Sequence, residues 1–164
     1  MALVNLSSKL AVAGLVVGLL LPGAAAWASE GAAASPGRAD TTARVDPIFS
    51  TIEKAWAAGD ARALVRTFGQ RKVFISLPDG GPAGGLFSRD QSYYILKDLF
   101  GTARTEEFAF VTIHGPEAER STAFGLAKRV FRPRDVGSAL SDRVFVSLVF
   151  EGDRWVVSEI KSVR

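Results

Sequence analysis

The chain has 164 residues, a formal net charge of +3 and no cysteine. This length allows one domain of roughly 100 to 150 residues plus an appendage, and the absence of cysteine excludes disulfides, thiolate metal sites and a cysteine nucleophile. So mild a charge also excludes the basic surface of a nucleic-acid-binding protein, and we predict no nucleic-acid partner.

The N-terminus has the pattern of a secretory signal peptide. Lys9 precedes an unbroken apolar run over residues 10–21, and a Pro-Gly pair and the sequence Ala-Trp-Ala follow this run. A basic start, a short apolar segment and an Ala-x-Ala site predict cleavage after Ala28, which makes residues 1–28 the signal peptide. We therefore predict export by the general secretory route, to a periplasmic or extracellular location.

An uncleaved membrane anchor is the alternative, because residues 10–28 approach the ~20 residues that span a bilayer. The Pro-Gly break and the Ala-Trp-Ala site favour cleavage, so we expect no stable membrane anchor in the mature protein. Residues 29–44 are rich in Ala, Gly, Ser and Thr and contain no large apolar side chain. Such a segment cannot offset its ordering entropy, which predicts a disordered spacer before a single domain over residues 45–164.

Two short helices are predicted to open this domain. Asp46 is a good N-cap, Pro47 fits the first helical position, and apolar residues recur at helical spacing up to Gly59, which ends the helix. Asp60 is expected to cap a second helix over residues 61–68.

A strand, a loop and a third helix follow. Residues 73–77 are β-branched and aromatic, which predicts a strand, whereas Gly and Pro dominate residues 78–85 and predict a loop. Ser88 and Gln91 form a capping-box pattern that begins the helix, and Gly101 is expected to end it.

The rest of the chain is predicted to be four strands, separated by turn residues, over residues 106–114, 118–131, 141–150 and 154–163. Helices followed by a run of strands indicate an α+β fold. We predict a curved antiparallel sheet wrapped around three N-terminal helices.

Two motifs stand out beside this order of elements: Ala55-Trp-Ala-Ala-Gly-Asp-Ala-Arg-Ala-Leu-Val-Arg-Thr-Phe68 and Gly152-Asp-Arg-Trp-Val-Val157. Together with the order of elements, they resemble the nuclear-transport-factor-2-like superfamily. Many members begin with a helix, a Gly-Asp break and a short helix, and end with a Gly-x-x-Trp strand. Residues 73–78 and 87–100 look like those of a small bacterial branch whose function is uncharacterised. The resemblance covers residues 45–164 and implies the cystatin-like cone.

The resemblance implies a fold and leaves the activity open, because the superfamily includes ketosteroid-isomerase-like enzymes, polyketide cyclases, dehydratases, transport factors and accessory domains. The isomerase branch needs an aspartate base with a tyrosine and an acidic partner in the pocket. This trio has no match here, so no catalytic residue is carried over.

Tyr94 and His114 are the candidate catalytic residues, and both are ligand-binding candidates together with Trp56 and Phe110. Strand alternation is expected to place His114, the only histidine, on the face that carries Phe108 and Phe110. There it could handle a proton, but an idle residue at a strand end is the interpretation that we favour. The Tyr94 phenol could donate to a bound carbonyl, although packing is its ordinary role.

The densest basic run contains Lys128, Arg129, Arg132 and Arg134, and Arg143 is expected nearby on the next strand. An arginine cluster can bind a carboxylate or phosphate, but we favour protection of an exposed strand edge. One histidine, no cysteine and no acidic cluster predict no metal site, and the glycine-rich loop lacks a nucleotide-binding motif, so we predict no cofactor.

These features predict an exported, non-catalytic binding or accessory domain that holds a small apolar ligand or a protein partner. One alternative is a cofactor-independent isomerase, cyclase or dehydratase acting on a small hydrophobic substrate. Another is a homodimeric scaffold module. An enzyme needs two convergent titratable groups in an apolar cavity, a binding domain needs only the cavity, and a scaffold exposes an apolar patch.

Overall fold

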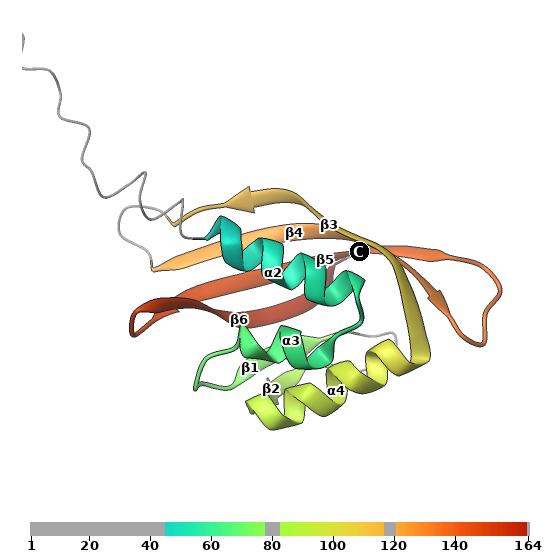
Figure 1. The fold of residues 1–164 in the computed structure, drawn as a ribbon, viewed down its shortest axis with the longest axis horizontal. Coiled ribbons are helices and arrows are strands. Elements are labelled where there is room, and N and C mark those ends of the chain that lie inside the picture. The colour runs from blue at the N-terminus through green and yellow to red at the C-terminus, as the bar shows by residue number, and fades with distance from the viewer. Residues whose placement is uncertain (1–44, 78–82, 117–120, 164) are drawn as a thin grey trace, which may run out of the picture. The chain divides into compact units, whose positions relative to one another are not determined.

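Three helices lie against one face of a curved sheet (Figure 1). The computed structural model describes residues 45–77, 83–116 and 121–163, which all belong to the unit Ala34–Arg164. The predicted signal peptide and the spacer lie outside the described residues. Within the described part of the chain, each helix is too short or too polar to cross a membrane.

The helices are α2 (Asp46–Ala57), α3 (Ala61–Arg66) and α4 (Arg89–Thr102). Two of the predicted caps are confirmed: Asp60 Oδ1 accepts from the amide of Ala63 at 2.9 Å, and Ser88 and Gln91 form a reciprocal capping box. The predicted cap at Asp46 is wrong. Helix α2 begins at this residue, with Val45 at the N-cap position, because Val45 already has a helical backbone.

Six strands form one sheet in the order β2-β1-β6-β5-β4-β3. This arrangement confirms the predicted α+β class with a sheet that curves over the helices. One pairing differs from the antiparallel expectation, since β1 runs parallel to β6. The short strand β2 was not predicted; it begins at Gly85, the last residue of the predicted loop, and forms because it pairs with β1. The strand bounds are β1 (Val73–Ser76), β2 (Gly85–Phe87), β3 (Ala103–His114), β4 (Thr122–Pro133), β5 (Leu140–Glu151) and β6 (Arg154–Val163).

The core lies between α2 and the sheet, where β4 presents small residues to large aromatic ones. Ala123 and Ala127 are fully buried and flank Gly125 on the face that α2 covers. Phe49 of α2 meets Phe110 of β3 edge to face, with ring centroids 4.8 Å apart. The small side chains of β4 therefore leave room for this aromatic pair.

Gly125 is expected to tolerate no side chain for this reason. A Cβ atom there would lie 2.7 Å from Cδ1 of Phe110 and 2.9 Å from Cε1 of Phe49. The Gly125→Ala variant should lose about 1–3 kcal/mol of unfolding free energy in urea denaturation, because overpacking strains the core. Gly137→Ala is the control, since nothing lies within 4 Å of the added atom. Equal stability of the two variants would show that the aromatic pair is not held against β4.

Candidate functional site

His114 lies on the opposite face of the sheet from Phe108 and Phe110, so the predicted shared face is wrong. A β-bulge interrupts β3 between Phe110 and Thr112. Because the extra residue reverses the alternation, Phe110 pairs with buried Ala127 whereas His114 pairs with Phe124. The His114 ring stacks on Phe124 at 4.6 Å and is exposed.

The other three candidates also occupy separate places. Trp56 is fully buried and stacks on Phe108 at 4.6 Å, while Phe110 packs against the same core. Tyr94 is 63% exposed on α4, and its ring contacts Tyr93. The structure therefore brings Trp56 and Phe110 together inside the core and leaves Tyr94 and His114 on different elements at the surface.

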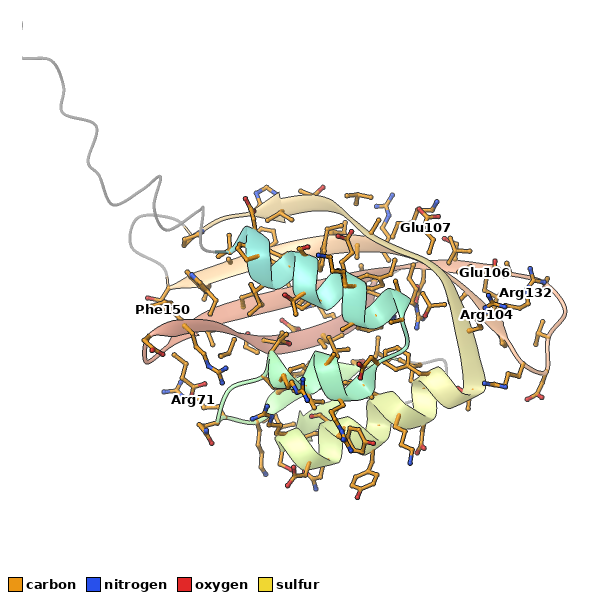
Figure 2. All side chains as sticks on the ribbon, in the orientation of Figure 1. Arg71, Arg104, Glu106, Glu107, Arg132 and Phe150 are labelled. Carbon is orange, nitrogen blue, oxygen red and sulfur yellow. The ribbon has the colours of Figure 1, made fainter. Side chains whose placement is uncertain are left out.

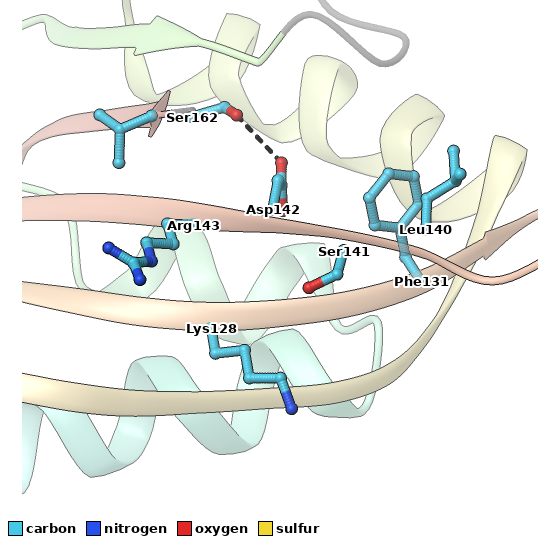
Figure 3. A pocket seen from close by; sticks show the side chains of 8 residues that line it. Lys128, Phe131, Leu140, Ser141, Asp142, Arg143 and Ser162 are labelled. Atoms are coloured by element: carbon cyan, nitrogen blue, oxygen red, sulfur yellow. Dashed lines mark hydrogen bonds between the residues drawn. The ribbon is translucent and has the colours of Figure 1, made fainter.

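A pocket of about 790 Å³ lies where β6 ends beside the longer strand β5 (Figure 3). The last pair between these strands joins Val163 to Arg143, and β5 continues beyond it to Leu140 with β4 as its partner. We call this hollow the rim pocket. Its lining residues are Lys128, Phe131, Leu140, Ser141, Asp142, Arg143, Ser162 and Val163.

A buried ion pair lies at the base of the rim pocket through Asp142, the member of the pair that lines the pocket. Nε of Arg129 lies 2.8 Å from Oδ1 of Asp142, and Nη2 lies 2.6 Å from Oδ2. The two side chains are only 2% and 10% exposed. Ser162 Oγ donates to Oδ2 at 3.0 Å, and the guanidinium lies 4.1 Å above the Phe131 ring. Both carboxylate oxygens of Asp142 are therefore occupied, and the pair fixes the positions of Phe131 and Ser162.

Two cations line the rim pocket from neighbouring strands. Lys128 and Arg143 are direct partners across β4 and β5, so their side chains leave the same face of the sheet. Lys128 Nζ lies 2.9 Å from Oε2 of Glu107, and about half of each side chain is exposed. The expectation that the basic run protects a strand edge is wrong, because β4 and β5 are inner strands of the sheet.

The basic run of β4 is divided between the two faces of the sheet. Arg132 points to solvent and makes an ion pair with Glu106, with Nε and Oε1 2.9 Å apart (Figure 2). Arg129 points to the opposite face and is buried. Arg134 follows the strand and lines a second hollow of about 530 Å³ with Arg104 and Arg132.

A third hollow of about 470 Å³ lies between α2 and the β5–β6 turn, with Ile48, Phe150 and Trp155 in its lining. Across the described ranges, no three His, Cys, Asp or Glu side chains gather in a way that could hold a metal ion. The rim pocket is thus the largest of the three hollows, and a buried charged pair lies at its base.

Sequence reasoning did not predict the burial of Arg129 or its pairing with Asp142. One signal was available, because alternation along β4 places Arg129 in the same set as the small buried residues Ala123 and Ala127. The partner could be found only with the β4–β5 register, which depends on the conformation of the intervening turn.

Comparison with known proteins supports the fold. No protein-family model and no curated protein matches the sequence. A ketosteroid isomerase-like protein from Erwinia carotovora atroseptica superposes with a TM-score of 0.59 at 13% identity, over 76% of this chain and 98% of that chain. A domain of unknown function with a cystatin-like fold from Nostoc punctiforme superposes with a TM-score of 0.57 at 12% identity, over 76% of this chain and 78% of that chain.

A third structure, a DUF4783 family protein from Bacteroides ovatus, gives a TM-score of 0.54 at 12% identity, over 69% of this chain and 91% of that chain. At such identities the likeness extends to the fold and not to the activity. This chain superposes on all three structures, and its own fold places helices over one face of a curved mixed sheet. The chain therefore has the nuclear-transport-factor-2-like, cystatin-like fold.

Proposed function

We propose that the protein is an exported, non-catalytic binding domain that holds a small ligand with an apolar body in the rim pocket. The observation that carries this proposal is a hollow of suitable size whose lining carboxylate, Asp142, is already paired with Arg129. Ligand pockets usually have volumes of about 300–1,000 Å³ and mostly apolar linings with a few polar groups. The rim pocket, at about 790 Å³, falls in this range.

The apolar part of the pocket supports an apolar ligand body. Leu140 is 43% exposed in the lining, whereas Phe131, packed against the Arg129 guanidinium, is only 3% exposed. Val163 completes the apolar lining. Covering such side chains with a ligand removes apolar surface from water, at about 25 cal/mol per Å².

A cofactor-independent isomerase is the second candidate, because one structural neighbour is titled ketosteroid isomerase-like. Such an enzyme needs a base that is free to take a proton from the substrate. Asp142 is the carboxylate in the lining of the rim pocket, and Arg129 and Ser162 already donate to its two oxygens. A residue held in this way positions its neighbours, so the binding function fits the geometry better.

Native mass spectrometry of the protein purified from the exported fraction tests the proposal. We expect the mass of the chain without residues 1–28 and a retained small molecule. Leu140→Glu should lose the molecule, because it places a charge against the apolar body. Val136→Glu is the matched control, since Val136 is 45% exposed in the neighbouring hollow and outside the rim pocket.

Several outcomes would contradict the proposal. A molecule lost equally in both variants would place the binding site elsewhere. An empty monomer would exclude a tightly bound ligand, and an empty dimer would favour a scaffold. Turnover of the retained molecule by the purified protein would favour the isomerase alternative.

A further inference from the structure

We infer that the ligand carries an anionic head group, such as a carboxylate, that binds Arg143 in the rim pocket, beside Lys128. This inference rests on the proposed function and adds the chemical class of the ligand. It follows from how the charges of the pocket are paired.

Lys128 and Arg143 form an unfavourable pair in the protein alone. They are direct partners on neighbouring strands, and like charges in this arrangement destabilise a sheet. Both residues line the rim pocket (Figure 3). An anion bound at Arg143 would offset this repulsion, which apolar or neutral ligands cannot do.

The acidic groups nearby do not supply this anion. Asp142 points to the opposite face of the sheet and binds Arg129 through both oxygens. Glu107 contacts Lys128, but this pair is about half exposed, and solvent screens such exposed pairs. The side chain of Arg143 has no ion-pair or hydrogen-bond partner among the residues that the structure describes.

Arg143 is therefore the stronger candidate for direct contact with the head group. A guanidinium presents several N–H donors in one plane and can bind both oxygens of a carboxylate. The hydroxyl of Ser141, which also lines the pocket, offers a further donor. The apolar body would then cross the edge of β5 beyond Arg143, where the pairing with β6 has ended, and reach Leu140 on the opposite face.

Isothermal titration with three ligands of equal chain length separates the head group from the body. We expect octanoate to bind about tenfold more tightly than 1-octanol, since only the carboxylate can accept charge-assisted hydrogen bonds from the Arg143 guanidinium. Octyltrimethylammonium should bind more weakly than 1-octanol, because Lys128 and Arg143 repel it.

The Arg143→Gln variant should remove most of the tenfold preference for octanoate, with only the weaker attraction of Lys128 left, and leave 1-octanol binding unchanged. Arg71→Gln is the charge-matched control. Arg71 is 87% exposed and lies at the opposite end of the molecule from Arg104 and Arg132 (Figure 2). The Arg71→Gln variant should retain the preference for octanoate, because the net charge of the protein does not create this preference.

The results distinguish the two proposals. Equal binding of octanoate and 1-octanol would overturn the anionic head group and leave the apolar pocket in place. Loss of the preference in both variants would assign it to the net charge and overturn the role of Arg143. Failure of all three ligands to bind would contradict the proposed function as well.

Discussion

Replacing Asp142 with alanine is expected to lower the free energy of unfolding by about 3–5 kcal/mol. The substitution removes the carboxylate that accepts from Nε and Nη2 of Arg129, whose side chain is only 2% exposed. The guanidinium stays buried, and this carboxylate no longer offsets the desolvation of its charge. Urea denaturation followed by circular dichroism measures the loss.

The double variant Arg129→Met, Asp142→Leu distinguishes the buried charge from a packing effect. Removing both charges leaves no uncompensated ion, so this variant should be more stable than Asp142→Ala alone. Asp153→Ala, in the exposed β5–β6 turn, is the control and should stay within about 0.5 kcal/mol of the parent. A small loss for Asp142→Ala would mean that the pair does not hold the base of the rim pocket.

Replacing Trp56 with alanine is expected to cost about 3–5 kcal/mol of stability. The Trp56 side chain is fully buried, stacks on Phe108 at 4.6 Å and meets Phe100 edge to face at 5.7 Å. The substitution leaves a large cavity between α2 and the sheet. Thermal and urea denaturation should both show the change.

This variant also separates a core role for Trp56 from the ligand-binding role that the sequence allowed. Tyr94→Ala is the matched aromatic control, and it should change stability by less than about 0.5 kcal/mol because Tyr94 is 63% exposed. If Trp56→Ala kept the parent stability and lost ligand binding instead, Trp56 would belong to a binding site and not to the core.

Local signals predicted most of the fold. The caps at Asp60 and Ser88 depend on side chains that reach residues three positions away, so the sequence contains all the necessary information. The parallel pairing of β1 with β6 joins segments that are distant in the chain, and no local pattern reports it. Strand β2 was missed for the same reason, because its structure depends on pairing with β1.

The site was less predictable, because it depends on register. One bulge after Phe110 moved His114 to the outer face, although simple alternation placed it inside. Arg129 and Asp142 meet only because β4 and β5 pair in one register. The sequence predicted that Lys128 and Arg143 lie near each other. It did not predict that the pairing of β5 with β6 stops at Arg143, beside the rim pocket.

Amide chemical-shift mapping of the labelled protein during titration with octanoate tests the rim pocket most directly. The account predicts saturable shifts at Ser141, Arg143 and Val163, which line the pocket, and little change at Trp56 or Tyr94. Shifts centred on His114 and Phe124 would instead place the ligand on the outer aromatic face. That result, or an absence of saturable shifts, would contradict the assignment of the rim pocket as the ligand site.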